Sequence, residues 1–199
     1  MKQGLKIPKE VAAVVEKLQG KGFEAYVVGG SVRDILQGNP PKDWDVTTSA
    51  KPEEITALFP DSFYENKFLT VTVKTKSEDP ALKEIEITTF RAEGKYTDKR
   101  HPDEVRFAKT LEEDLSRRDF TVNAVALKIA KAKTQIVDIF EGEKDLEKKL
   151  IRAVGDPEAR FGEDALRMIR AVRLAVELDF SIEEKTKTTL RELAGAIQF

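Results

Sequence analysis

The chain has 199 residues, enough for one ordinary domain and part of a second, and its 40% hydrophobic and 35% charged residues exclude wholesale disorder. It contains no cysteine and one histidine, His101, which excludes disulfides, thiolate catalysis and multi-histidine metal sites, so any metal must bind to carboxylates. The net charge of −2 predicts no global attraction to nucleic acid, and the lack of a long apolar run or a signal-type start predicts a cytoplasmic protein with no membrane partner.

The first ninety residues mix helices and strands. Apolar residues spaced three and four apart predict an opening helix that ends at Gly20. A β-rich run then leads into Gly29-Gly30, after which Ser31 can cap a short helix. The predicted elements are helices over residues 8–19, 31–37 and 51–59, and strands over residues 23–28, 43–48, 68–75 and 84–90.

The second half becomes helical. The polar segment from Arg91 to Pro102 predicts a mobile loop, and regular structure resumes near Glu112. We expect a turn or short helix and a strand within 118–130, a strand over 136–140, and helices over 144–150, 157–178 and 181–196. The change from mixed to helical patterns predicts a domain boundary near residue 150.

Two aspartates flank a tryptophan at Asp43-Trp44-Asp45. On a strand, the period of two sends both carboxylates to one face, while Trp44 and Val46 point to the other. Two carboxylates on one rigid face suit a hard, oxygen-binding cation such as Mg²⁺. The same pattern also occurs at capped strand ends, at exposed edges and in glycosyltransferases that bind nucleotide sugars, so alone it leaves those alternatives open.

The segment upstream adds a phosphate-binding pattern. Paired glycines at Gly29-Gly30 let backbone N–H groups at a helix N-terminus approach a phosphate, and Arg33 can supply a charged fork. A plain strand-to-helix turn explains the glycine pair alone. It explains less well the glycines, Arg33 and the Asp43/Asp45 pair together within residues 29–45.

These segments together resemble a known family. G-G-S-V-R-D (residues 29–34) followed by D-W-D (43–45) resembles motif A of the class II tRNA nucleotidyltransferases and bacterial poly(A) polymerases, in the polymerase-β-like superfamily. R-R-D-F-T-V-N-A (117–124) is similar to the family's R-R-D-F-T-x-N-A motif. D-I-F-E-G (138–142) resembles the connection from head to neck, and E-D-A-L-R (163–167) resembles the neck motif E-D-x-x-R. The resemblance covers nearly the whole chain in the family's order.

The resemblance implies an α+β fold, in which a mixed antiparallel sheet with flanking helices is followed by all-α neck helices. It implies template-independent transfer of CMP and AMP from CTP and ATP to the 3′ end of tRNA, with Mg²⁺ as cofactor. Residues 1–150 would form the catalytic head and residues 151–199 the start of a nucleotide-selecting neck. The implied metal ligands are Asp43 and Asp45, and the implied nucleotide-binding residues are Gly30, Arg33, Arg117, Asp164, Arg167, Arg170 and Arg173.

The neck motif also has a physical interpretation. On one continuous helix, Asp164 and the three arginines that follow it advance three residues at a time and form a polar stripe, opposite Met168, Ile169, Val172 and Val176. Exposed salt bridges are the plain alternative. Cytosine and adenine each place an exocyclic amine beside a ring-nitrogen acceptor, so an Asp164 acceptor next to an Arg167 donor fits both and rejects uracil and guanine.

Several alternatives remain open from the sequence. Poly(A) polymerase and CC-only or A-only enzymes share these motifs; a glycosyltransferase and a non-catalytic nucleotide- or RNA-binding domain belong to other classes. Glu86 is a candidate third acidic group or a solvent-facing residue, and Arg118 a phosphate contact or a partner of Glu112 or Asp114. The family's common K-x-G-T is replaced by Lys67-Phe68-Leu69-Thr70, which predicts a different turn. The chain ends before the body and tail of full-length relatives, so we expect a fragment or an unusually short enzyme.

Overall fold

The computed structural model describes residues 5–65, 69–93, 105–130 and 133–197. The chain folds into two compact units. The first unit comprises residues 1–90, 108–111 and 125–137, and the second comprises residues 91–107, 112–124 and 138–199. The chain therefore returns twice to the first unit after leaving it at residue 91, and the boundary predicted near residue 150 stays a prediction.

A seven-stranded sheet forms the first unit, in the order β3-β4-β5-β2-β1-β8-β9. Strands β2 and β5 are parallel, whereas β1 pairs antiparallel with β2 and β8, and β4 with β3 and β5, which confirms a mixed sheet. The strands are β1 (Ala25–Val28), β2 (Asp45–Thr48), β3 (Ser62–Glu65), β4 (Thr70–Lys74), β5 (Glu84–Thr89), β8 (Val125–Ala130) and β9 (Lys133–Asp138).

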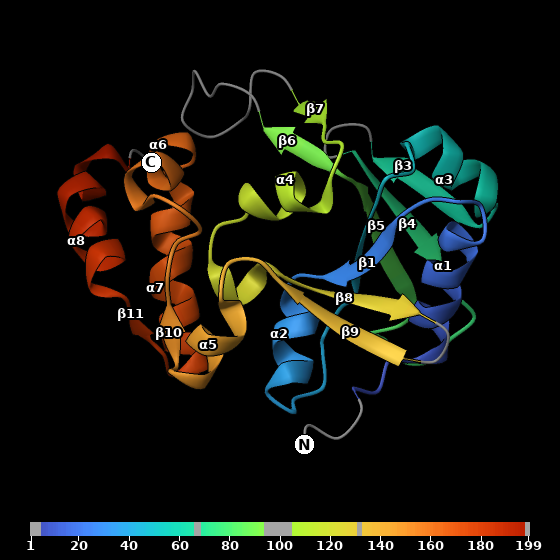
Figure 1. Ribbon diagram of the computed structural model, residues 1–199, viewed down its shortest axis with the longest axis horizontal. Coiled ribbons are helices and arrows are strands. Elements are labelled where there is room, and N and C mark those ends of the chain that lie inside the picture. The colour runs from blue at the N-terminus through green and yellow to red at the C-terminus, as the bar shows by residue number, and fades with distance from the viewer. Residues whose placement is uncertain (1–4, 66–68, 94–104, 131–132, 198–199) are drawn as a thin grey trace. The chain divides into compact units, whose positions relative to one another are not determined.

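One face of this sheet carries the hydrophobic core. The strand register aligns a row that crosses six strands, and five of its residues are fully buried. Burial of each such aliphatic side chain contributes about 1.5–3 kcal/mol. Helices α1 (Lys9–Gln19), α2 (Gly30–Leu36) and α3 (Pro52–Leu58) pack into the same core (Figure 1). The row consists of Tyr64, Val71, Ile87, Val46, Val27 and Leu127.

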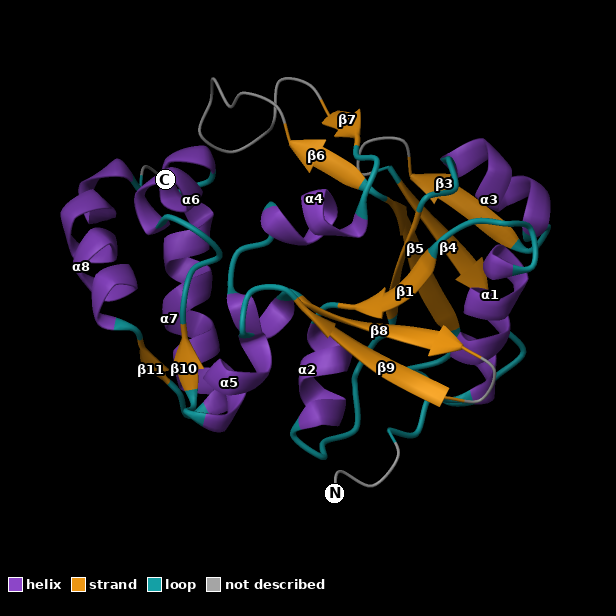
Figure 2. Ribbon diagram, in the orientation of Figure 1, coloured by secondary structure: helices purple, strands orange, loops and turns teal. Residues whose placement is uncertain are grey.

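The second unit is mainly helical (Figure 2). Helix α6 packs against both α7 and α8, and the short parallel pair of β10 and β11 contacts α7. Its helices are α4 (Leu111–Ser116, of which Leu111 belongs to the first unit), η2 (Thr121–Asn123), α5 (Gly142–Glu147), α6 (Pro157–Glu163), α7 (Leu166–Leu178), α8 (Glu184–Leu193) and η3 (Ala194–Ala196). Its strands are β6 (Arg91–Glu93), β7 (Val105–Phe107), β10 (Leu150–Ile151) and β11 (Ser181–Ile182).

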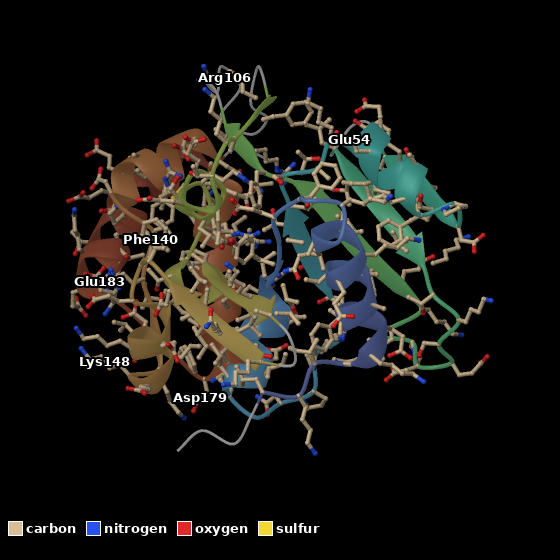
Figure 3. The ribbon with its side chains drawn as sticks, turned by 45° about the vertical axis from the view of Figure 1, so that its right-hand side comes forward. Glu54, Arg106, Phe140, Lys148, Asp179 and Glu183 are labelled. Carbon is tan, nitrogen blue, oxygen red and sulfur yellow. The ribbon has the colours of Figure 1, made fainter. Side chains whose placement is uncertain are left out.

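A buried carboxylate ties three segments of the second unit together. Asp145 accepts hydrogen bonds from the Thr121 hydroxyl at 2.6 Å and from Arg152 Nε at 2.8 Å. Arg152 also donates from Nη2 to the backbone carbonyl of Phe140, at 2.8 Å; Phe140 is labelled in Figure 3. Since the donors and the acceptor satisfy one another, their hydrogen bonds offset the desolvation cost of burying the Asp145 carboxylate.

The structure corrects several sequence-based expectations. The predicted helix over 157–178 is two helices, because Asp164 has extended backbone angles (φ −139°, ψ 107°) between α6 and α7. The predicted strand over 43–48 begins only at Asp45, and Asp43 lies in a bend before it. The predicted loop from Arg91 begins as strand β6, paired with β7; His101 lies outside the described residues.

Strand β3, over residues 62–65, is an element that sequence patterns did not predict. Within the ranges that the structure describes, no helix has the length and apolar character needed to cross a membrane.

Candidate active site

Acidic residues meet on the sheet face opposite the core. Asp45 on β2 lies directly opposite Glu86 on the parallel strand β5. The Glu86 backbone N–H donates to the carbonyl of Trp44 at 3.1 Å, which fixes the register of the two strands at this point. Trp44 and Val46 are buried on the core side, as the alternation predicts, while Asp43 is exposed and Asp45 half-buried.

Glu86 lies near three other acidic side chains, Asp43, Glu65 and Glu84. Partial burial of its carboxyl is the main cause that raises the pKa above the ordinary value, and the charges of Asp43, Glu65 and Glu84 raise it further. Carboxylate oxygens are the donors that a hard divalent cation prefers, and such a cation would relieve this mutual repulsion.

A divalent ion fits this donor set without a closed protein cage. Among the residues that the structure describes, no three acidic or histidine side chains already converge closely enough to enclose an ion. Mg²⁺ is ordinarily held by one or two carboxylates together with waters and substrate phosphates. An open face with Asp43, Asp45 and the neighbouring Glu86 matches that mode of binding.

The glycine pair forms a sharp turn at the start of α2. Gly29 has φ 81° and ψ −148°, angles that essentially only glycine adopts. The buried Ser31 hydroxyl donates to the carbonyl of Val28 at 3.0 Å and braces the turn. A Cβ on Gly30 would lie 3.5 Å from Arg33 Nη2, so the guanidinium of Arg33 stands beside the second glycine. Arg33 also pairs with Asp34, with Nε 2.9 Å and Nη2 2.8 Å from the Asp34 Oδ1.

Arg117 is held by a buried carboxylate in the second unit. Asp114, fully buried, accepts from Arg117 Nε at 3.1 Å and Nη2 at 3.0 Å, and it lies 3.3 Å from Arg118 Nη2. Burial alone would raise the Asp114 pKa, but Arg117, Arg118 and the Arg91 backbone N–H together hold that pKa below its ordinary value. The salt-bridge alternative for Arg118 is confirmed with Asp114 as partner.

Arg170 is held by the aspartate of the R-R-D-F segment. Asp119 Oδ2 accepts from Arg170 Nε at 2.7 Å and lies 2.6 Å from Arg170 Nη2. The other oxygen, Oδ1, accepts the backbone N–H of Phe120 at 2.8 Å. A nearly buried carboxylate therefore orients a guanidinium whose side chain is 46% exposed.

The residues of the E-D-x-x-R segment do not form one helical stripe. Asp164 precedes helix α7, and its Oδ1 accepts the backbone N–H of Leu166 at 2.9 Å. Arg167, only 7% exposed, lies with Nη1 2.8 Å from Glu163 Oε2, and Glu163 also pairs with Arg160. Asp164 is thus not part of the predicted i,i+3 stripe, because it lies between α6 and α7, whereas Arg167, Arg170 and Arg173 keep that spacing on α7.

The remaining stripe residues are on the surface. Arg173 pairs with Glu177 at 3.6 Å, and both side chains are more than half exposed. On the side of α7 that was predicted to be apolar, Met168 is buried, whereas Ile169, Val172 and Val176 are exposed. The structure thus gives Arg117, Arg167 and Arg170 fixed acidic partners and leaves Arg173 in a loose exposed pair.

Sequence reasoning named Asp114 only as a possible partner of Arg118, and it missed Asp119 and Glu163 as partners of the arginines. Asp114, Asp119 and Glu163 each orient an arginine expected to bind nucleotide, and all three lie in or next to the motifs quoted above. Their only signal was that position in the sequence. The spacing of 51 residues between Asp119 and Arg170 gives no periodic pattern to detect.

Comparison with known proteins identifies relatives of this chain. The family described as Poly A polymerase head domain matches residues 25–152. A CCA-adding enzyme of Lactobacillus helveticus is 51% identical over 180 residues, which are 90% of this chain and 43% of that protein.

Two solved structures extend the comparison. The Bacillus stearothermophilus CCA-adding enzyme in complex with CTP has a TM-score of 0.82 at 39% identity, over 96% of this chain and 45% of that one. The Thermotoga maritima CCA-adding enzyme complexed with tRNA has a TM-score of 0.75 at 28% identity, over 96% of this chain and 43% of that one. This chain thus spans less than half the length of these relatives. Since the family match covers more than half of its residues, the chain belongs to the poly(A) polymerase head domain family of polymerase-β-like nucleotidyltransferases.

Proposed function

We propose that this chain carries the catalytic and nucleotide-selecting part of an enzyme that adds CMP and AMP, from CTP and ATP, to the 3′ end of tRNA without a template. The observation that carries the proposal is the acidic sheet face on which Asp45 lies opposite Glu86, next to Asp43. Similarity to CCA-adding enzymes, one complexed with CTP and one with tRNA, supports the choice of substrates.

Asp43 and Asp45 would hold Mg²⁺, with Glu86 as a neighbouring third acidic group. Nucleotidyltransferases of this family generally use divalent metal ions, and Mg²⁺ is our specific assignment. Bound there, Mg²⁺ supplies Lewis-acid activation of the RNA 3′-hydroxyl and charge neutralisation of the departing pyrophosphate. The protein's part is to hold these carboxylates on adjacent strands of a rigid sheet, so that little reorganisation is needed when substrate arrives.

Gly30, Arg33 and Arg117 would bind the triphosphate and ribose. Gly30 leaves its backbone open to close approach, and Arg33 can exchange its Asp34 partner for a phosphate oxygen of higher charge. Arg117 is oriented in advance by the buried Asp114, which lowers the entropy lost when the guanidinium engages a ligand.

Asp164 and Arg167 would read the base. Asp164 accepts the exocyclic amine of cytosine or adenine, and Arg167 donates to the adjacent ring nitrogen. Glu163 holds Arg167 in a nearly buried position, so the donor is fixed before the nucleotide binds. Arg170 and Arg173 complete the proposed nucleotide-binding set, and residues 1–150 and 151–199 are the proposed head and neck of a cytoplasmic enzyme.

The direct experiment supplies the protein with tRNA that lacks its CCA end and with each labelled nucleoside triphosphate in turn. We expect incorporation of C and A but not of U or G, in the presence of Mg²⁺. The Asp45→Asn protein is the matched control and should incorporate none. Failure of the unmodified chain to incorporate any nucleotide under these conditions would contradict the proposal.

A poly(A) polymerase is the second candidate, since the matching family is described by that activity. Sequencing of the extended RNA separates the candidates. A CCA end supports the first proposal, a run of A supports the second, and C or A alone identifies a partial activity.

A further inference from the structure

An exposed phenylalanine shares the sheet face of the carboxylates. The register pairs Phe63 on β3 with Thr72 on β4, Thr72 with Glu86 on β5, and Glu86 with Asp45 on β2. Paired residues of neighbouring strands point to the same side of a sheet. Phe63, Glu86 and Asp45 therefore form one row across this face.

The next residue of the same strand points to the other face. Tyr64 pairs with the buried Val71, which belongs to the core row. Burial raises the pKa of the Tyr64 phenol, and the nearby charge of Glu53 on α3 raises that pKa further. Phe63 is 41% exposed and lies away from that core. Its ring is thus available to a ligand on the carboxylate side.

A cation accompanies the ring. Lys74 lies two residues after Thr72 on β4 and so on the same face, and its Nζ is 5.7 Å from the centre of the Phe63 ring. An aromatic surface beside a lysine is the combination with which proteins bind single-stranded nucleic acid, because the base stacks on the ring and the cation meets the backbone phosphate.

The distance from the carboxylates suits one end of an RNA chain. Because strands lie about 4.8 Å apart, Phe63 stands about 10 Å from Glu86 and about 15 Å from Asp45 along the row. The metal-bound 3′-hydroxyl, the sugar, the base and the stacking gap to the ring together span this separation when the terminal nucleotide extends along the row.

We propose that Phe63 and Lys74 form the binding site for the 3′-terminal nucleotide of the RNA that is extended, with its base stacked on Phe63 and a phosphate at Lys74. The proposal rests on the proposed function and deepens it. Stacking uses the face that every base has, so it tolerates any base. An enzyme that adds C, C and A in succession begins on whatever base ends the unfinished tRNA and then extends a terminal C twice, and a base-tolerant contact accommodates both cases.

Binding of a short 5′-fluorescein RNA that ends in CC, measured by anisotropy with the full chain, tests the proposal. Phe63→Ala should raise Kd roughly 5- to 100-fold, and Phe63→Trp should retain affinity because it keeps a stacking surface. Lys74→Gln should weaken binding and lower the slope of log K against log salt by about one. Tyr64→Ala is the matched control, an exposed aromatic of the same strand on the opposite face, and should leave Kd unchanged.

A second measurement locates the contact. An RNA with 5-iodocytidine at its 3′ end should cross-link to Phe63 under ultraviolet light at saturating protein. An unchanged Kd for Phe63→Ala, or a cross-link elsewhere, overturns the proposal. Because β3 is an edge strand, Phe63 could also promote self-association of the chain, so the sedimentation of wild type and Phe63→Ala is compared. If the substitution changes only self-association, the proposal is overturned as well.

Extension kinetics separate this proposal from the proposed function. If the wild type extends RNA, Phe63→Ala should raise KM for the RNA while KM for CTP stays unchanged. If the wild type and Phe63→Ala both extend RNA with the same KM for the RNA, the stacking site is rejected and the proposed function is not. If RNA binding depends on Phe63 but the wild type extends no RNA, the proposed function is rejected, and Phe63 and Lys74 form only an RNA-binding site.

Discussion

Asp119 holds Arg170 through a single carboxylate oxygen, which lies 2.7 Å from Arg170 Nε and 2.6 Å from Nη2. The other Asp119 oxygen accepts the Phe120 backbone N–H at 2.8 Å. One nearly buried carboxylate therefore fixes both the local turn of the R-R-D-F segment and the direction of a guanidinium on α7, 51 residues away.

A double-mutant cycle tests this coupling. We expect Asp119→Ala and Arg170→Ala to be non-additive in unfolding free energy by about 1 kcal/mol, because one end of the pair is half-exposed and water weakens the interaction. Asp119→Ala should cost more than Arg170→Ala, since it also removes the acceptor of a backbone N–H. The exposed Arg173–Glu177 pair is the matched control, with a coupling below about 0.5 kcal/mol.

The carboxylates of the sheet face give the second prediction. Asp43→Asn and Asp45→Asn each remove a negative ligand, so nucleotide transfer should fall at least a hundredfold, the kinetic equivalent of about 3 kcal/mol. Neither change alters the volume of the side chain or touches the core row. Circular dichroism should therefore match the wild type, and the melting temperature should not fall. Transfer at near-normal rates in either variant would refute the assignment.

Glu86 predicts a pH dependence of stability. Its folded-state pKa lies above the ordinary value of 4.5, so between these two values the folded protein binds more protons than the unfolded chain, and its contribution to stability is lost as pH rises through that window. Glu86→Gln should remove this loss and raise the metal-free melting temperature at pH 7 but not at pH 4. Glu177→Gln is the control, and melting curves in EDTA across this range are the measurement. Equal shifts at both pH values would contradict the argument.

The two glycines before α2 should respond differently to alanine. Gly29→Ala should cost about 2–3 kcal/mol, because its angles of φ 81° and ψ −148° exclude a Cβ. Gly30→Ala meets only an ordinary contact 3.5 Å from Arg33 Nη2, so stability should change by less than about 1 kcal/mol. If Gly30 serves nucleotide approach, that variant should raise KM for CTP instead. Urea unfolding and steady-state kinetics separate the two roles.

Local patterns predicted the elements that obey them. Helix α1 follows from period 3.6 and strand β5 from period 2, because their buried faces repeat at those spacings, whereas in β4 three consecutive residues, Val71 to Val73, are buried. Strand β3 has no such signal, since Phe63 and Tyr64 are both exposed on an edge strand and no alternation distinguishes its faces. The break at Asp164 was missed because residues 157–178 keep a helical pattern throughout, and the extended backbone of Asp164 is visible only in the structure.

The candidate site likewise contains residues that the sequence predicted and residues that only the structure revealed. Motif residues could be named from the sequence, but their partners could not, since contacts such as Arg91 with Asp114 or Arg170 with Asp119 join distant segments that only the tertiary fold brings together. Leu69 is a related case. It stands where the family commonly has glycine, and it keeps a left-handed backbone with φ 52°. This conformation favours glycine, and the changed turn predicted there stays a prediction, because residues 66–68 lie outside the described residues.

Base selection gives the last prediction. Asp164→Ala removes the acceptor for the exocyclic amine of C or A and should lower discrimination against UTP and GTP by roughly ten- to a hundredfold, equivalent to about 1.5–3 kcal/mol, with a smaller loss of total activity. Arg167→Ala should instead weaken CTP and ATP together, because it removes a donor that both use. Since Asp164 also accepts the backbone N–H of Leu166 at the start of α7, Asp164→Ala should cost about 1 kcal/mol of stability. Asp156→Ala, which removes the side-chain cap of α6, is the control for that loss and should leave nucleotide choice unchanged. The ratios of kcat/KM among the four nucleotides decide the matter: if they stay constant in both variants, Asp164 and Arg167 only shape the junction between two helices.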